Sequence, residues 1–468
     1  MPDIDQLLRA TQANPSDESC RLALAEALEE KGDPRGEFIR VQCELPTLPS
    51  DDPRRAILAD REQKLLAQNA RFWLGGFRDA AMRYEFRRGL LHLWLSIETF
   101  CSNQMNTLAS SDPYRWVEEL TLAFKGRPRS LAKLFNTPLF DRINSLDLSA
   151  LKLRPRDAQA LAESPHLSNL VRLNLAKSNI GDDGAKALAA SPHLSKLTWL
   201  ELSGNQIGPE GAKALVSSEF LTNLTYLGLS QNPLTDEGIE AIAELGQLPA
   251  LVSLDLSATK MTSDGLVRLA RAAIMQKLVT TDLGRNRIGP EGAEALACSE
   301  GLANLRTLKL AGCSLRAEGV EGFTAGAGLA NVTVLDLASN ELDDEGVEAF
   351  AKATSFTSLL ELSLEDNLLG ARGLKALASV KHLQQLQLLN LRNNMLRNDG
   401  AKVVAEATAW PQLKHLDLSI NGITAPGARA LADSHWMGSL VKLDLTKNDV
   451  GAEGIVLLNK RFNGKVLL

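Results

Sequence analysis

The chain has 468 residues, a formal net charge of −6 and a pI of about 5.7, which argues against a general nucleic-acid-binding surface. Its 44% hydrophobic residues are ordinary for a folded protein, and no run of about 18 uncharged apolar residues suggests a membrane span. Five irregularly spaced cysteines without a C-x-x-C motif favour a reducing compartment, the cytoplasm, over a disulfide framework or zinc site. The first residues, MPDIDQLLRA, lack the basic start and apolar run of a secretory signal, so we expect none.

Residues 1–85 carry no repeat and are predicted to form a small helical domain. Apolar spacing and capping residues predict four helices: one around Ile4–Leu8, one from Asn14-Pro15 to Gly32, one opened by Asp33-Pro34, and one from about Arg54 to Trp73. The tetrapeptide at residues 32–35 could be a binding loop, but a turn between two helices is the favoured interpretation. Arg87-Arg88-Gly89 is interpreted as the junction into the first strand rather than as a basic patch.

Three stretches of this region carry a family resemblance: LALAEALEEKGDPRGEFIRVQCEL (22–45), RFWLGGF (71–77) and YEFRRGLLHLWL (84–95). They resemble a helical domain found in bacteria beside repeat arrays, called a repeat-companion domain. The resemblance implies a bacterial protein and an N-terminal cap, and it implies no activity.

From residue 86 to 468 the chain is predicted to be a solenoid built from one recurring unit, of which LTWLELSGNQIGPEGAKALVSSEFL (197–221) is typical. The first leucine of the unit returns every 27 residues, for example at Leu170, Leu197 and Leu224. The first two or three repeats, with Trp94, are degenerate, as terminal repeats usually are. An Asn column and a Gly column follow the same spacing: Asn205, Asn232, Asn286, Asn340, Asn367, Asn394, Asn421 and Asn448, and Gly184 to Gly454 without a break over eleven repeats.

This pattern resembles leucine-rich repeats of the ribonuclease-inhibitor type over about four-fifths of the chain. The resemblance implies an α/β solenoid with a curved parallel sheet inside and helices outside. Period-2 alternation points Leu200 and Leu202 inward and Trp199 and Glu201 outward. The Asn amides are expected to satisfy backbone groups where each strand ends, so that each repeat supports the next. The glycines fit either a close approach or a positive φ before each helix.

The sequence contains few residues that could carry catalysis or bind a metal. His166, His193 and His382 share one slot of the repeat and could form a partial metal pair, but too few ligands converge. Cys298 or Cys313 could be a nucleophile, as in leucine-rich ubiquitin-ligase effectors, but those carry the thiol in a separate domain. We therefore expect no enzyme activity, no metal and no cofactor.

The exposed strand positions predict a protein-binding surface. From Ile143 onward they hold nine acidic and four basic residues, which favours a basic protein partner. Trp199 and Tyr226 occupy equivalent positions on neighbouring strands, although a Trp there could simply shield its neighbours. The predicted partner-binding residues are Arg172, Trp199, Glu201, Tyr226, Asp255, Asp282 and Asp336.

The predicted function is a non-catalytic scaffold that binds a partner protein on the concave face. The alternative, suggested by the family resemblance, is a regulator that activates or inhibits a partner enzyme such as a small GTPase or a nuclease. The last repeat replaces two apolar residues by Asn459 and Gly464, so we expect a capped end and a monomer that binds neither nucleic acid nor membrane.

Overall fold

A computed structural model describes residues 3–15, 17–49, 52–124, 131–149, 151–245, 248–353 and 355–468. The chain forms two compact units. Unit 1 comprises Met1–Asn205 and Ser218–Leu224, and unit 2 comprises Gln206–Ser217 and Thr225–Leu468. This division falls inside the repeats, and the domain boundary expected near residue 85 stays a prediction.

Unit 1 begins with helices, as expected: α1 (Ile4–Ala13), α2 (Glu18–Glu30), α3 (Arg35–Glu44), a short 3-10 turn η1 (Leu45–Thr47), α4 (Arg54–Leu74) and α5 (Phe77–Ala80). The start expected at Asn14-Pro15 is wrong, because Asn14 ends α1 and the Asp17 carboxylate caps α2 by accepting the Ser19 N–H at 2.9 Å. Gly32, at φ +73°, follows the end of α2, as expected.

A β-hairpin that the sequence did not predict follows the helices. Strand β1 (Arg83–Arg87) pairs antiparallel with β2 (Leu90–Ser96). Arg88 and Gly89 form the two-residue turn, with φ of 48° and 83°, and positive φ at both positions is what the tightest hairpin turns require. Arg87–Gly89 is therefore the tip of a hairpin, and the purely helical structure expected for residues 1–85 is wrong at β1, which joins the sheet antiparallel to β2.

The rest of unit 1 is a parallel ladder. Strands β2 to β6 pair in chain order. Leu146, Leu173 and Leu200, at the centres of β4, β5 and β6, are buried, which confirms the predicted inward face. The elements after β2 are α6 (Ile97–Phe100), α7 (Asn103–Ala109), α8 (Asp112–Arg115), β3 (Val117–Ala123), β4 (Ser145–Asp147), α9 (Pro155–Ala162), β5 (Arg172–Asn174), α10 (Gly181–Ala189) and β6 (Trp199–Glu201), with short 3-10 turns between them.

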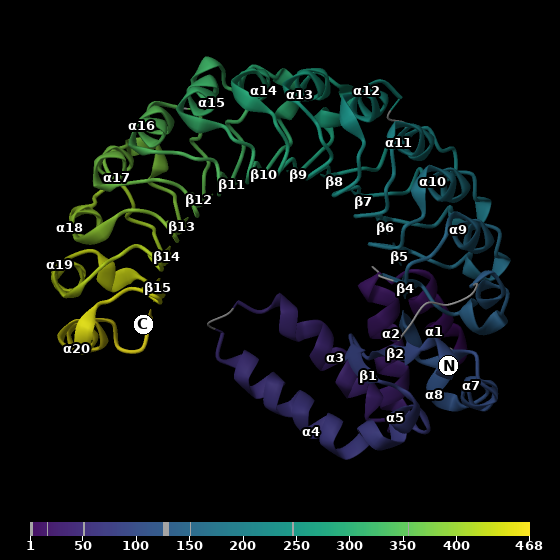
Figure 1. Ribbon diagram of the computed structural model, residues 1–468. Coiled ribbons are helices and arrows are strands. Elements are labelled where there is room, and N and C mark those ends of the chain that lie inside the picture. Colours follow the sequence, from purple (N-terminus) through teal and green to yellow (C-terminus); the bar gives the residue numbers. More distant parts are fainter. Residues whose placement is uncertain are drawn as a thin grey trace. The chain divides into compact units, whose positions relative to one another are not determined.

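Unit 2 continues the alternation of strand and helix. Figure 1 shows its strands on the inner side of its curve and its helices on the outer side. All strand pairs recorded within this unit are parallel and follow chain order, through to β16 (Val466–Leu467), which pairs with β15. The elements are α11 (Pro209–Val216), β7 (Tyr226–Gly228), α12 (Thr235–Leu245), β8 (Ser253–Asp255), α13 (Ser263–Ala270), β9 (Thr280–Asp282), α14 (Gly289–Ala297), β10 (Thr307–Lys309), α15 (Arg316–Gly322), β11 (Val334–Asp336), α16 (Asp344–Lys352), β12 (Glu361–Ser363), α17 (Ala371–Leu377), β13 (Leu388–Asn390), α18 (Arg397–Glu406), β14 (His415–Asp417), α19 (Ala425–Asp433), β15 (Lys442–Asp444), α20 (Gly451–Phe462) and β16.

The Asn column ties neighbouring repeats together, as expected. Asn286 Oδ1 accepts the backbone N–H groups of Thr259 (3.0 Å) and Met261 (3.1 Å) in the preceding repeat, and Asn286 Nδ2 donates to Leu256 O at 2.8 Å. The two N–H groups are buried backbone that would otherwise lack a hydrogen bond, whereas Leu256 O also accepts the Thr259 hydroxyl at 2.8 Å. The same two-way bonding to the preceding repeat recurs at Asn205, Asn340, Asn367, Asn394, Asn421 and Asn448.

The Gly column serves a close approach between helices. A Cβ on Gly238 in α12 would lie 3.0 Å from Leu234 Cβ and 3.3 Å from Pro209 Cα. None of the described glycines of the column has a positive φ, so that half of the expectation is wrong. Gly346 and Gly373 likewise approach backbone atoms of the preceding helix, whereas the close atoms at Gly319 and Gly400 belong to the leucine just before the same helix.

A serine column that sequence analysis missed closes the helix ends. Ser299 Oγ donates to the carbonyl of Ala270, the last residue of α13, at 2.5 Å. Ser164, Ser191 and Ser218 repeat this contact in unit 1 at the same 27-residue spacing. Helices leave their last carbonyls unpaired, and here the next repeat supplies the donor.

Candidate binding face

The outward residues of unit 1 line up in two rows across its strands. Strand pairing places His92, Glu119, Ser145, Arg172 and Trp199 in one row, and Trp94, Thr121, Asp147, Asn174 and Glu201 in the other. Arg83 of β1 faces Trp94 in the same sheet. We call these residues, together with Arg87, the unit 1 strand face.

Two connected hollows mark this face. One, of about 260 Å³, lies between Trp94 and Trp199. The other, of about 490 Å³, lies between the strands and the N-terminal helices, where Leu45 and Pro46 line it. Both hollows are lined by Arg87, Glu119, Ser145 and Arg172, so we call the two together the unit 1 groove. The hollows exist because small residues stand between bulky ones along each row of the unit 1 strand face.

Guanidinium groups stack on both tryptophans of the groove. Arg172 Cζ lies 4.3 Å from the centre of the Trp199 ring, and Arg83 Cζ lies 4.6 Å from that of Trp94. His92 stacks on Trp94 with ring centres 3.6 Å apart. Cation–π contacts of this kind hold the two guanidinium groups in place over the tryptophan rings.

Glu119 is the recessed acid of the groove. Arg87 Nη1 donates to Glu119 Oε2 at 2.9 Å, and burial raises the pKa of the Glu119 carboxyl. His92 Nε2 lies 2.9 Å from Thr121 Oγ1, whereas its Nδ1 lies 3.2 Å from Glu119 without the alignment of a hydrogen bond. Burial, reinforced by the charges of Arg87 and Arg83, lowers the pKa of His92 to about 3, so the imidazole is neutral at physiological pH.

The N-terminal helices form the fixed back wall of the groove. Arg21 of α2 and Glu118 of β3 form a buried ion pair at 3.2 Å. Asn144 Nδ2 joins this pair by donating to Glu118 Oε1 at 3.1 Å and to Gln12 O at 3.0 Å. A buried charge left without its partner would be costly, so this network holds the helices against the first strands.

The predicted aspartates of unit 2 have a structural task that sequence analysis missed. Oδ1 of Asp255, Asp282 and Asp336 accepts the backbone N–H two residues further on, at 2.9, 3.0 and 3.0 Å. This bond shapes the turn in which each strand ends. Burial, and secondarily the neighbouring charge of Asp255, raises the pKa of Asp282, while Lys309 Nζ approaches its carboxylate at 3.9 Å.

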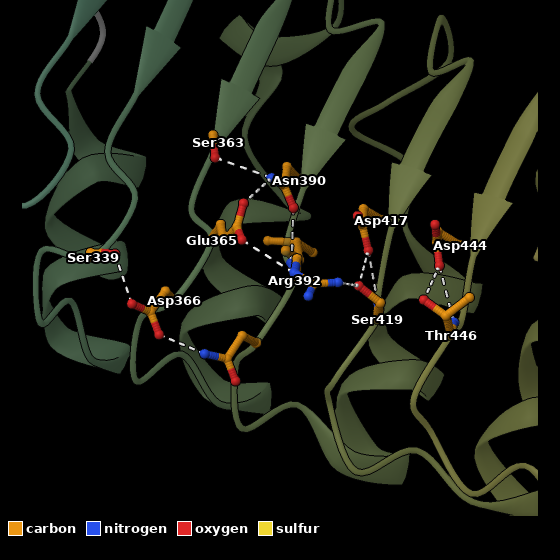
Figure 2. Close-up of polar contacts among 12 residues, drawn as sticks. Ser339, Ser363, Glu365, Asp366, Asn390, Arg392, Asp417, Ser419, Asp444 and Thr446 are labelled. Atoms are coloured by element: carbon orange, nitrogen blue, oxygen red, sulfur yellow. Dashed lines mark hydrogen bonds and ion pairs between the residues drawn. The ribbon is translucent and has the colours of Figure 1, made fainter. Parts of the chain in front are cut away.

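Farther along unit 2 the same strand-end positions join side-chain networks (Figure 2). Asp417 Oδ1 accepts the backbone N–H of Ser419 at 2.8 Å and its hydroxyl at 2.6 Å, and Asp444 binds Thr446 in the same way. Arg392 bridges Glu365 at 3.2 Å and Ser419 Oγ at 2.9 Å. Glu365 is thus paired with a cation and Asp444 Oδ2 lies 3.8 Å from Lys442 Nζ, whereas Asp417 accepts its bonds from the neutral donors of Ser419.

The structure brings together part of the predicted site. Arg172, Trp199 and Glu201 lie on the unit 1 strand face, whereas Tyr226, Asp255, Asp282 and Asp336 belong to unit 2. Trp199 and Tyr226 are half-buried rather than fully exposed. Their side-by-side placement stays a prediction. Sequence analysis missed Arg83, Arg87, Trp94 and Glu119, although the bulk of Trp94 in a degenerate repeat was a visible signal.

The histidines and cysteines of the described residues do not form a catalytic or metal-binding arrangement. The described residues contain no group of three or more His, Cys, Asp or Glu arranged to hold a metal ion. Cys313 is fully buried at an Asn-column position, and burial raises the pKa of its thiol to about 12. His166 Nδ1 lies 2.8 Å from the Asp141 carboxylate. No helix in the described ranges has the length and apolar character needed to cross a membrane.

Comparison with known proteins identifies the repeats. Eight segments match the family model described as Leucine Rich repeat: residues 166–189, 193–216, 220–243, 275–297, 328–351, 357–378, 411–432 and 439–458. The chain therefore carries leucine-rich repeats, and proteins built from them are generally protein–protein interaction scaffolds. A search of curated proteins found no match.

Solved structures include two with a similar chain path. An internalin (inlF) from Listeria monocytogenes is 18% identical, with a TM-score of 0.44, and the match covers 69% of this chain and 86% of that one. The mouse RP105/MD-1 complex contains a chain that is 17% identical, with a TM-score of 0.46, and the match covers 80% of this chain and 58% of that one.

Proposed function

We propose that this leucine-rich-repeat chain is a non-catalytic scaffold that binds a partner protein on its strand faces. The observation that carries the proposal is the stacking of Arg172 on Trp199 at an outward position of the sheet. Trp and Arg are the residues most often responsible for binding energy at protein interfaces. Repeat arrays characteristically use such extended faces for recognition.

The charge of unit 2 supports a partner surface that is basic where it meets this unit. The outward and strand-end residues of unit 2 include seven acids and three bases: Asp255, Asp282, Asp336, Glu361, Glu365, Asp417 and Asp444 against Lys309, Arg392 and Lys442. Complementary charge of this kind speeds association and disfavours acidic competitors, even where each ion pair adds little affinity.

The remaining parts of the proposal concern the organisation of the chain. We infer that the repeats are of the ribonuclease-inhibitor type, supported by the helix that follows most strands of the array. We also infer that residues 1–85 act as an N-terminal cap, supported by the buried Arg21–Glu118 pair that ties them to β3. The protein is also proposed to be monomeric and cytoplasmic; its five irregularly spaced cysteines without a C-x-x-C motif favour a reducing compartment.

The proposal is tested by affinity capture on the immobilised full chain. Wild type is compared with an Arg172→Ala/Trp199→Ala variant and with a Thr280→Ala/Thr307→Ala control, which alters the same outward slot in two other repeats. We expect a protein that wild type and the control retain and the Arg172/Trp199 variant loses. Equal capture by all three chains would contradict a role for this face.

A further inference from the structure

We propose that the outer edge of β1 binds an extended segment of a partner protein, which adds a further strand to the sheet of unit 1. The segment pairs with Tyr84 through backbone hydrogen bonds, and its apolar side chains cover Met82 and Tyr84. This inference goes beyond the proposed function, which concerns the strand faces, because the contact lies at a strand edge. The edge adjoins the unit 1 strand face, since Arg83 of β1 belongs to that face.

The pairing of the hairpin determines the direction of the Tyr84 backbone groups. Phe86 is paired with Leu91, but the Leu91 N–H donates to Trp116 O at 2.9 Å, on the side of β2 that faces β3. The Phe86 carbonyl also bonds away from β2, because Gln42 Nε2 of α3 donates to it at 3.0 Å. Hydrogen-bonded and non-hydrogen-bonded pairs alternate along an antiparallel pair of strands. Tyr84, two residues before Phe86, therefore also points its N–H and C=O away from β2.

These two groups of Tyr84 lie on an open edge. Among the described residues β1 pairs with β2 alone, and no described residue bonds the Tyr84 N–H or C=O. The opening is short, because Gln42 already binds Phe86 O on one side and the Met82 N–H donates to Trp94 O at 2.8 Å on the other. One residue of an antiparallel strand supplies the acceptor and the donor that Tyr84 requires. An open edge of this kind is a template for a strand of another chain.

The side chains beside the opening favour an apolar occupant. Met82 and Tyr84 are 57% and 42% exposed. The Tyr84 ring lies 6.4 Å from that of Phe86, which lies 5.7 Å from the ring of the buried Trp73. Tyr84 is thus the exposed end of an aromatic row that continues into α4. A residue directly opposite Tyr84 places its side chain on the same face, where aromatic and β-branched residues form favourable cross-strand pairs.

The other face of β1 carries charges that are already paired within the chain. Glu85 lies 3.0 Å from Arg87 and 3.8 Å from Arg83, and Arg87 also binds Glu119 at 2.9 Å. The occupant therefore needs no particular charge. The residues on either side of the one opposite Tyr84 point their side chains toward this polar face. The occupant is accordingly an extended segment with apolar residues at alternate positions and polar residues between them.

Peptide selection on the full chain tests the edge. A random linear dodecapeptide library is selected on wild type, on Tyr84→Val, which keeps the backbone N–H and a strand-forming side chain, and on Tyr84→Pro, which lacks the N–H. Because this N–H faces away from β2, proline removes no hydrogen bond between β1 and β2. We expect wild type and Tyr84→Val to recover peptides with alternating apolar residues, and Tyr84→Pro to recover at least about tenfold fewer. No enrichment, or equal recovery on Tyr84→Pro, would overturn the proposal.

A methyl scan of a recovered peptide distinguishes strand pairing from other modes of binding and uses only the wild-type chain. Each backbone N–H of the peptide is replaced in turn by N–CH3, and the affinity is measured by calorimetry. Methylation of the residue paired with Tyr84 should weaken binding at least about tenfold, whereas methylation of its two neighbours, whose N–H groups point away from β1, should have little effect. Equal effects at every position would overturn the proposal. So would a doubled mass of wild type in light scattering that Tyr84→Pro abolishes, because β1 would then pair with a second copy of this chain.

Discussion

Gly89, in the turn between β1 and β2, packs directly against Ile39 of α3. A Cβ at Gly89 would lie 2.0 Å from Ile39 Cγ1, and the residue has a φ of +83°. We predict that Gly89→Ala lowers the free energy of unfolding by about 3 kcal/mol or more, because it adds a steric clash to backbone strain. Urea denaturation followed by circular dichroism measures the change.

Gly32 provides the matched control, because its φ is +73° and nothing lies within 4 Å of the position its Cβ would take. Gly32→Ala should cost only the backbone strain, about 1–2 kcal/mol. If the two variants lose equal stability, the contact with Ile39 does not constrain the hairpin.

Removing one Asn of the column, Asn286, should break four buried hydrogen bonds to the preceding repeat. Asn286→Ala leaves the backbone N–H groups of Thr259 and Met261 without their partner, while Leu256 O keeps its bond from the Thr259 hydroxyl. We expect a loss of at least about 1–3 kcal/mol in the free energy of unfolding, the cost of a buried unsatisfied group. Asn331→Ala, which removes one exposed bond to Ala303 O, should stay within about 0.5 kcal/mol of wild type. Comparable losses of stability for both variants would contradict the conclusion that the Asn column ties neighbouring repeats together.

Cys313 should not behave as a nucleophile in the native protein. Burial raises the pKa of its thiol to about 12, so almost none is thiolate at pH 8, and the side chain is inaccessible. Iodoacetamide at pH 8 should label exposed Cys298 and leave Cys313 unmodified until the chain is unfolded. Peptide mass spectrometry reads both sites in one sample, and rapid native labelling of Cys313 would refute the expectation.

His92 should make unit 1 less stable as the pH falls. Its pKa is lowered from 6.5 to about 3 in the folded chain, so between these values the unfolded chain binds the proton more readily. The free energy of unfolding should therefore decrease from pH 6.5 toward pH 3. The part of this decrease that is due to His92 should be absent in the His92→Gln variant. Parallel slopes for wild type and His92→Gln in this range would show that the imidazole is not held neutral.

The regular part of the fold was predictable because each repeat encodes it locally. Leu200 and Asn205 recur every 27 residues, and the strand and its Asn-bonded turn need no information from distant sequence. The β1 strand was not predictable, because Arg83–Arg87 joins the sheet through a hairpin outside the repeat. The 27-residue spacing of the serine column can be read from the sequence, but its hydrogen bonds to the helix ends of the preceding repeat cannot.

The candidate site was predictable only at the residues that follow the repeat. Arg172 and Trp199 sit on outward slots that the spacing identifies. Arg87 of β1 and Trp94 of β2 line the same groove, but β1 lies outside the repeat and the repeat that contains β2 is degenerate. The recess of Glu119 depends on burial by side chains from several strands and on the Arg87 contact, which no local pattern encodes.

The central claim is that the strand face around Arg172 and Trp199 binds a partner protein. The most direct test is isothermal titration calorimetry of the captured, purified partner with wild type, Trp199→Ala and Thr307→Ala, the last at the same slot four repeats further on. Trp199→Ala should weaken binding by about 2 kcal/mol or more with its melting temperature retained, while Thr307→Ala binds like wild type. Equal affinity for wild type and Trp199→Ala would contradict the account.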